Sequence, residues 1–195
     1  MNQKLNQIVI TVLDYETTGS VLGYPNEPWQ IGLVSLKEGR VDSASLFESF
    51  LRVDLDRPFN SHAPGRHALI RKELSESPRP AEIWQQIKSR LTNRSLCAHN
   101  VATEKKFVQR MAPMHPFGPW IDTLRLARKA WPDLSSYALE DVILSLDLKS
   151  QVEVLLPNRG FHDALYDAVA SAVFLEHLLK QPHWQNLTCD AICSL

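Results

Sequence analysis

The chain has 195 residues, of which 44% are hydrophobic and 22% are charged. This is enough apolar material for one ordinary globular core, and the length favours a single domain. The 21 basic and 22 acidic residues nearly cancel, which excludes a whole-molecule positive field that would bind a long polyanion by counterion release alone. If the ligand is nucleic acid, the contact must be local or metal-assisted.

The cysteines and the N-terminal residues bear on the compartment. Cys97, Cys189 and Cys193 have neither the even count nor the spacing of a disulfide framework, and no CxxC pair indicates zinc. The N-terminal residues contain no long apolar stretch, and the apolar run at residues 8–13 is too short for a signal core or a membrane span. These features predict a cytoplasmic protein without a membrane association.

Three strands are predicted in the first part of the chain. The apolar, β-branched run IVITVL, residues 8–13, predicts a central strand that is buried on both faces and ends at Asp14. After a loop rich in turn formers, WQIGLVSL at residues 29–36 predicts a second strand. Residues 45–53, in which polar and apolar side chains roughly alternate, predict a third. Three successive strands favour a meander.

Helices and short strands alternate along the rest of the chain. The segment AEIWQQIKSRL, for example, places its large apolar side chains on one helical face. The resulting order, β-β-β-α-β-α-β followed by helices, predicts an α/β architecture with a mixed sheet. The predicted elements are helices at 81–91, 102–111, 124–131, 137–146 and 163–179, strands at 95–98 and 120–122, and a terminal helix within the last 15 residues that packs on the body.

Two carboxylates stand at the end of the most buried predicted strand, in DYETTG. A spacing of two puts Asp14 and Glu16 on one face of an extended chain, and open α/β sheets bind ligands at the carboxyl ends of their strands. The alternative is a polar turn made by Thr17, Thr18 and Gly19, with Asp14 solvated. Two acids at the rim of a dry sheet repel one another unless a cation lies between them.

Two later segments carry further acids. AHNVATEKKF places Glu104 in a helix after a short strand, where an acid beside two lysines would by itself be a solvated helix charge. GFHDALYDAVASAVFL places His162 before or at the start of an apolar helix, with Asp167 one and a half turns further in. An acid this close to a packed face needs a partner, although Asp163 and Asp167 could also simply favour the helix N-terminus.

The segments DYETTG, HNVATE and HDALYDA, in this order, resemble the three-motif signature of the DEDDh 3′–5′ exonucleases, the family of the proofreading epsilon subunit of bacterial DNA polymerase III. WQIG, IDTLRLAR and YALEDV resemble the intervening segments of that family, so the resemblance covers roughly residues 7–180. It implies a ribonuclease H-like mixed five-stranded sheet flanked by helices. Residues 1–180 would form the exonuclease domain, and residues 181–195 a C-terminal helical tail packed on it.

The resemblance also implies the chemistry, which is hydrolysis of phosphodiester bonds of DNA or RNA from the 3′ end, with release of nucleoside monophosphates. Two divalent cations, Mg²⁺ or Mn²⁺, suit an all-carboxylate ligand set. Asp14 would touch both ions, Glu16 and Asp167 would complete the first, and a histidine would be the general base. The family has aspartate at the position of Glu104, whose extra methylene could still reach a metal-bound water of the second ion. The predicted catalytic residues are Asp14, Glu16, Glu104, His162 and Asp167.

The expected partner is a nucleic acid with a free 3′ end, single-stranded at that end. Substrate contacts are predicted for Tyr15, Thr17, His99 and Asn100, although the last two could instead order the strand-to-helix turn. Aromatic side chains near the acids could stack terminal bases; these are Tyr15, Tyr24, Trp29 and Phe107, of which Trp29 and Phe107 fit a core equally well. Basic side chains that could meet phosphates are Arg66, Arg71, Lys72, Lys105 and Lys106.

Two features fit the family less well or add nothing to the site. RHALI at residues 66–70 aligns only loosely with the family's usual HGI-type stretch. The other histidines have no ligand-like spacing; they are His62, His67, His99, His115, His177 and His183. No polymerase-binding segment is evident, so a polymerase partner, the oligomeric state and the choice between DNA and RNA stay open.

Two other classes of function compete with the exonuclease hypothesis. Glu104 in place of aspartate could leave an exonuclease fold that binds nucleic acid but has lost turnover. A two-carboxylate hydrolase acting on a sugar would need an acid pair without a required metal. Nuclease assays with and without a chelator separate all three.

Overall fold

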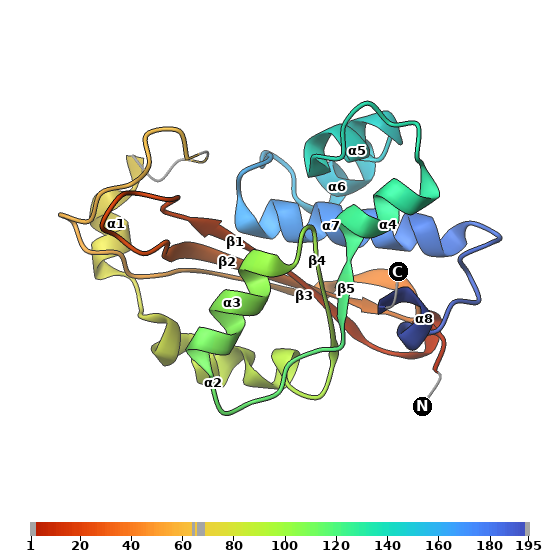
Figure 1. Cartoon of the computed structure of the whole chain (residues 1–195), viewed down its shortest axis with the longest axis horizontal. Coiled ribbons are helices and arrows are strands. Elements are labelled where there is room, and N and C mark those ends of the chain that lie inside the picture. The colour runs from red at the N-terminus through yellow and green to blue at the C-terminus, as the bar shows by residue number, and fades with distance from the viewer. Residues whose placement is uncertain (1–2, 64, 66–68, 194–195) are drawn as a thin grey trace.

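The computed structural model describes residues 3–63, 65 and 69–193. Five strands form one sheet in the order β3-β2-β1-β4-β5, with β1 at its centre (Figure 1). β1 pairs antiparallel with β2, which pairs antiparallel with β3, whereas β4 runs parallel to both β1 and β5. This mixed five-stranded sheet confirms the predicted architecture. The strands are β1 (Ile10–Thr17), β2 (Pro28–Lys37), β3 (Arg40–Phe50), β4 (Ser95–Ala98) and β5 (Trp120–Asp122).

Helices cover both faces of the sheet (Figure 1). The long helix α7 lies across β1, β2 and β3 and is contacted by α4, α5 and α6, while α3 packs against β1 from the other face together with α2. The helices are α1 (Arg71–Glu76), α2 (Pro80–Leu91), α3 (Ala102–Met111), α4 (Thr123–Ala130), α5 (Leu139–Ser145), α6 (Lys149–Leu155), α7 (Ala164–Lys180) and α8 (Cys189–Cys193), with a short 3-10 helix η1 (Leu5–Gln7) before β1.

Each face of the sheet has its own apolar core, and β1 contributes to both. Val12 packs in the cluster that includes α7, whereas its neighbour Leu13 packs in the cluster that includes α2 and α3, because successive strand side chains point to opposite faces. On β2, a Cβ added to Gly32 would lie 2.3 Å from the carbonyl oxygen of Ala164. Glycine at this position is therefore required for the first residue of α7 to lie directly on the sheet.

Two predicted strand boundaries are wrong. β1 does not end at Asp14 but continues to Thr17, because β2 pairs with it along its whole length. The third strand spans Arg40–Phe50 instead of residues 45–53. Its first half is polar because much of this edge strand is exposed to solvent, so the sequence shows no apolar alternation there.

The helices α1 and α6 were not predicted. Each is short and has a single buried residue, Leu74 in α1 and Val152 in α6, which leaves no periodic apolar signal to detect. The predicted bounds of β4, β5 and α3 agree with the structure. In the described part of the chain, none of the helices combines the length and the hydropathy needed to cross a bilayer.

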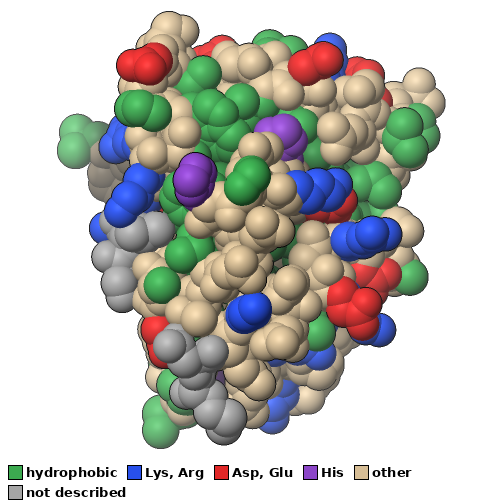
Figure 2. All heavy atoms as spheres, turned by 90° about the vertical axis from the view of Figure 1, so that its right-hand side faces the viewer, with side chains coloured by type: hydrophobic (Ala, Val, Ile, Leu, Met, Phe, Trp, Pro, Cys, Tyr) green, Lys and Arg blue, Asp and Glu red, His purple; other side chains and the backbone are tan. Residues whose placement is uncertain are grey.

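The segment 181–193 lies beside the N-terminal residues of the chain (Figure 1). The amide of Leu5 donates to the carbonyl oxygen of Leu187 at 3.1 Å, and α8 contacts β5. Cys189 and Ile192 of α8 are buried in the larger core. Figure 2 shows this end of the molecule, where basic and acidic side chains are both present and neither sign dominates. This mixture is consistent with the nearly balanced overall charge.

Candidate active site

Asp14 and Glu16 lie on the half of β1 that extends beyond β4. Among the described residues, β4 pairs with β1 only at residues 10–12, so one side of β1 has no strand partner where the carboxylates stand. Both point to the same face because they are two residues apart. Glu16 is only 7% exposed. The central strand thus presents two acids at the carboxyl edge of the sheet, where β1 and β4 diverge.

Glu104 reaches this edge from the first turn of α3. It is only 4% exposed, and its Oε2 atom is buried without a hydrogen-bond partner in the described part of the chain. Burial, followed by the negative charge of Asp14, raises the pKa of Glu104 to about 8. The alternative that Glu104 is a solvated helix charge is therefore wrong.

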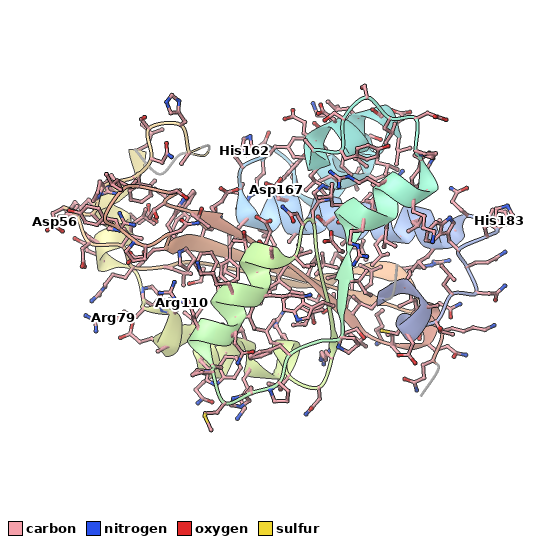
Figure 3. All side chains as sticks on the ribbon, in the orientation of Figure 1. Asp56, Arg79, Arg110, His162, Asp167 and His183 are labelled. Carbon is pink, nitrogen blue, oxygen red and sulfur yellow. The ribbon has the colours of Figure 1, made fainter. Side chains whose placement is uncertain are left out.

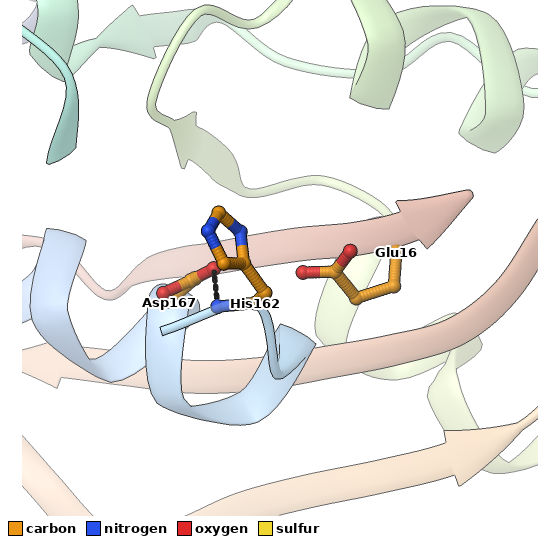
Figure 4. A group of neighbouring side chains, drawn as sticks. All are labelled: Glu16, His162 and Asp167. Atoms are coloured by element: carbon orange, nitrogen blue, oxygen red, sulfur yellow. Dashed lines mark hydrogen bonds between the residues drawn. The ribbon is translucent and has the colours of Figure 1, made fainter. Parts of the chain in front are cut away.

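Asp167 lies in the first turn of α7, and His162 lies in the loop just before this helix (Figure 3). His162 has a φ of 65° and an exposed side chain, and its backbone N–H donates to Oδ2 of Asp167 at 3.1 Å. The possible ligand atoms of Glu16, His162 and Asp167 all lie within 4.8 Å of one another (Figure 4). It is the only such group of three or more in the described residues. His183, in contrast, lies at one end of the molecule, away from His162 and Asp167 (Figure 3).

Each of the four acids at this edge has a raised pKa; they are Asp14, Glu16, Glu104 and Asp167. Burial is the largest cause of each pKa shift, and the charges of neighbouring acids add to it. The pKa is raised to about 7 for Asp14, about 8 for Glu16 and about 9 for Asp167. Within the described residues, none of the four forms an ion pair with a basic side chain, and Oδ1 of Asp167 is buried without a hydrogen-bond partner. Buried carboxylate oxygens without donors fit a divalent cation such as Mg²⁺ or Mn²⁺.

The predicted substrate-binding residues have different surroundings. His99 is bonded at both ring nitrogens, Nδ1 to Oγ1 of Thr123 at 3.0 Å and Nε2 to the carbonyl oxygen of Tyr137 at 2.9 Å. Asn100 is exposed in the left-handed region, with a φ of 67°, and its N–H donates to Oδ1 of Asp122. These contacts order the turn from β4 into α3, which brings Glu104 to the acids.

Tyr15 and Thr17 are the other two predicted substrate contacts. The Tyr15 ring points away from the Asp14 face and packs edge-on against Phe107, with 5.5 Å between centroids. It is 7% exposed, which leaves little surface for stacking a base. Thr17 is half-buried at the strand end, and its carbonyl oxygen accepts from Nε1 of Trp29 at 3.1 Å.

The remaining aromatic and basic candidates fall into core and surface positions. Trp29 and Phe107 are buried, whereas Tyr24 is 49% exposed with the Arg57 guanidinium 4.7 Å from its ring centroid. Arg71 donates to the carbonyl oxygen of Leu55 at 2.7 Å. Exposed lysines are Lys72, Lys105 and Lys106. Arg66 and His67, in the stretch that aligns loosely with the family, lie outside the described residues.

One group beside the site was missed by sequence analysis. Arg159 forms ion pairs with both Glu48 and Asp163 next to His162. The four-residue spacing between Arg159 and Asp163 is a signal that could have indicated the nearer contact, whereas Glu48 lies 111 residues away in the sequence.

A family model described as an exonuclease, that of RNase T, matches residues 11–175. The chain therefore belongs to the RNase T exonuclease family, which confirms the resemblance in the sequence motifs. It is 31% identical over 191 residues to the 3′-5′ exonuclease DinG of Staphylococcus haemolyticus, covering 94% of this chain and 19% of DinG. It is 26% identical over 176 residues to exodeoxyribonuclease 10 of Escherichia coli, covering 90% of this chain and 71% of that protein.

A DNA polymerase III subunit epsilon-like protein of Rhodobacter capsulatus is 24% identical over 187 residues, covering 94% of this chain but 25% of the relative. Solved structures show the same fold. Exonuclease X in complex with 5′ overhanging duplex DNA superposes with a TM-score of 0.70 at 24% identity, covering 95% of this chain and 98% of that one. Pop2p of S. pombe, in a Mg²⁺- and Mn²⁺-bound form, gives 0.72 at 14% identity, with coverages of 95% and 88%. The chain has the DEDD exonuclease fold.

Proposed function

We propose that this chain is a metal-dependent 3′–5′ exonuclease that removes nucleoside monophosphates one at a time from a free 3′ end. The observation that carries the proposal is the group of four acids at the edge of the sheet, which lack a cationic partner among the described residues and lie beside an exposed histidine. Relatives named 3′-5′ exonuclease and exodeoxyribonuclease support the reaction and its direction. Residues 1–180 would form the catalytic domain, with residues 181–195 as a tail packed on it.

The acids would bind two divalent cations, Mg²⁺ or Mn²⁺. Asp14 would contact both ions, Glu16 and Asp167 the first, and Glu104 the second through a water molecule. When bound, such ions neutralise charge on the phosphate, lower the pKa of a coordinated water and stabilise the leaving oxygen. The structure of Pop2p with Mg²⁺ and Mn²⁺ supports the choice of metals. Four carboxylates would balance the four positive charges of the two ions.

The protein's own groups would supply positioning and proton transfer. His162 would take the proton of the attacking water, since a neutral imidazole ring has a free nitrogen that can act as a general base. Its exposed ring can then release that proton to solvent. Oδ2 of Asp167 accepts from the backbone N–H of His162, so the same acid that would bind metal also fixes the backbone that carries the base.

The proposed substrate is nucleic acid that is single-stranded at its 3′ end. The solved complexes of Exonuclease X with 5′ overhanging duplex DNA and of E. coli Exonuclease I with a dT13 oligonucleotide support such a substrate. Thr17 and Asn100, at the strand end and the following turn, are the proposed contacts; Tyr15 and His99 would act by shaping these two segments. Four relatives are named after DNA polymerase III, so association with a polymerase is also proposed.

Glu104 supports a second candidate, a binding module with weakened turnover. The family has aspartate at this position, and one extra methylene would shift any ion that the side chain contacts. In that case the chain would bind a 3′-ended strand in the presence of metal but leave it intact.

Digestion of 5′-labelled oligonucleotides tests both candidates. Single-stranded DNA, duplex DNA and RNA would each be incubated with Mg²⁺, Mn²⁺ or EDTA, with a 3′-blocked copy of each strand. We expect a ladder that shortens from the 3′ end, no digestion in EDTA and resistance of the blocked strands. The matched control is Glu153→Gln, which changes an exposed acid paired with Lys149 on α6 and should digest like wild type, whereas Asp167→Asn should not.

Cleavage of circular or 3′-blocked strands as fast as open ones would show an endonuclease instead. Tight metal-dependent binding without digestion, restored to digestion by Glu104→Asp, would favour the binding module.

A further inference from the structure

Arg159 connects the loop before α7 to the sheet through two carboxylates. Its Nη1 and Nη2 atoms donate to Oε1 and Oε2 of Glu48 on β3 at 2.9 and 2.6 Å, a two-pronged ion pair. Nη2 also lies 2.6 Å from both carboxylate oxygens of Asp163. The Arg159 side chain is 21% exposed and that of Asp163 is 12% exposed. Partly buried, charge-assisted bonds of this geometry are stronger than exposed ion pairs.

The same group continues into the start of α7. Oδ1 of Asp163 accepts from the backbone N–H groups of Leu165 and Tyr166, which makes it the N-cap of the helix. Gln30 on β2 donates to Glu48 and accepts from the N–H of Ala164. The first turn of α7 is thereby tied to two strands of the sheet by side-chain contacts.

His162 lies inside the segment that these contacts enclose. Only residues 160–162 separate Arg159 from Asp163. The backbone of His162 has a φ of 65°, a conformation that residues other than glycine rarely adopt. On its other side, a Cβ added to Gly65 would lie 3.1 Å from the carbonyl oxygen of His162. A residue in this backbone conformation persists only where its surroundings fix it.

We propose that Arg159 is a positioning residue for His162, acting with Glu48 and Asp163 to fix the loop that presents the base. This inference rests on the proposed exonuclease function. The two carboxylates of Glu48 and Asp163 more than balance the single positive charge of Arg159, so it acts through the loop and not by binding a phosphate. Its loss should therefore lower kcat and leave KM nearly unchanged.

The geometry also distinguishes arginine from lysine. A guanidinium can meet Glu48 with two parallel N–H donors while Nη2 meets Asp163, whereas an ammonium is a single point charge. Arg159→Lys should keep the charge but recover only part of the positioning. If charge alone mattered, lysine would restore full activity.

The test compares steady-state digestion of a 5′-labelled single strand by wild type, Arg159→Ala, Arg159→Lys and Glu48→Gln. We expect kcat to fall about tenfold to a hundredfold in Arg159→Ala, since a displacement of about 1 Å can cost a hundredfold in rate. Arg159→Lys should fall between Arg159→Ala and wild type. The double variant Glu48→Gln/Arg159→Ala should be no slower than Arg159→Ala, because both changes remove the same contact.

Lys180→Ala is the matched control, because it removes an ion pair with Glu176 at the other end of α7 and leaves the loop untouched. Its kcat should equal that of wild type. Glu48→Gln changes a side chain that is 42% exposed on an edge strand, so it keeps the test usable if Arg159→Ala does not fold. Wild-type kcat in Glu48→Gln, a rise in KM without a fall in kcat, or full activity of Arg159→Lys would each overturn the inference. An inactive wild type would instead contradict the proposed function.

Discussion

Two groups of acids flank the start of α7, and they differ in how their charges are balanced. Asp163 and Glu48 both pair with Arg159, and Asp163 also caps the helix. Asp167, one turn further along, has a buried oxygen without a hydrogen-bond partner in the described structure and a pKa raised to about 9, chiefly by burial and then by Asp14 and Glu16. The paired group fixes the start of α7 and the loop that carries His162, whereas a buried acid that the protein leaves without a partner among the described residues indicates a ligand.

The largest expected effect comes from substituting one acid of each group, because one change should lower activity and the other should lower stability. Asp167→Asn should lower kcat about a hundredfold to a thousandfold, the usual cost of losing one group that stabilises transition-state charge. In EDTA its melting temperature should equal or exceed that of wild type, since the amide stays neutral at every pH, whereas the buried carboxyl of Asp167 is stable in the fold only while it holds a proton. Asp163→Ala should lower the free energy of unfolding by about 1–2 kcal/mol through loss of the N-cap. Thermal melts and single-strand digestion of both variants check this, and an equally destabilised Asp167→Asn would make Asp167 a structural acid.

Glu104 should show the next largest effect. Because a water-mediated contact to the second ion is expected, Glu104→Ala should lower kcat at least about tenfold, equal to about 1.4 kcal/mol. Glu104→Asp should keep or raise the rate. Because Glu104 is buried, Glu104→Gln should also raise the melting temperature in EDTA, unlike Glu73→Gln, which changes an exposed acid in the first turn of α1. Equal rates for wild type, alanine and aspartate variants would remove Glu104 from the site.

The pH dependence of stability should also reveal the raised pKa values of the buried acids. Glu16, Glu104 and Asp167 have folded pKa values raised to between about 8 and 9, well above their unfolded values. The folded protein therefore binds more protons than the unfolded one at intermediate pH, and stability falls as pH rises. In EDTA the free energy of unfolding should therefore decrease as the pH rises from about pH 5 to about pH 9.

Urea titrations at several pH values measure this decrease. Asp167→Asn should flatten the slope, because one of the titrating groups is gone. A stability in EDTA that stays constant or rises over this range would contradict the unbalanced-charge account of the acids.

Most of the elements could be predicted because their signals are local, whereas the division of the apolar residues into a core on each face of the sheet was not predicted. β1 begins with an uninterrupted apolar run, and the short strands β4 and β5 are apolar segments bounded by turns. The polar half of β3 and the short helix α6 gave no such signal, since solvent covers most of their side chains.

The candidate site was predicted from the order of three motifs, not from local signals. In sequence, two lysines beside Glu104 indicate a solvated charge; its burial arises because β4 leaves β1 and the turn at His99 directs α3 over that edge. Asp163 was considered only as a helix N-terminal charge, and its partner Arg159 was missed because Glu48, the residue that anchors Arg159, lies on a strand far away in sequence. Contacts of this range depend on the assembled sheet.

Metal-dependent thermal stability tests the central claim, that the four acids form a divalent cation site, most directly. A ligand that binds only the native protein adds about 2.7 kcal/mol at a hundred times its Kd, so the melting temperature of wild type should rise steadily as Mn²⁺ is added. The rise should be lost or much reduced in Asp167→Asn and kept in Asp163→Ala. A wild-type melting temperature that does not change up to millimolar Mn²⁺, in protein that is folded, would contradict the account.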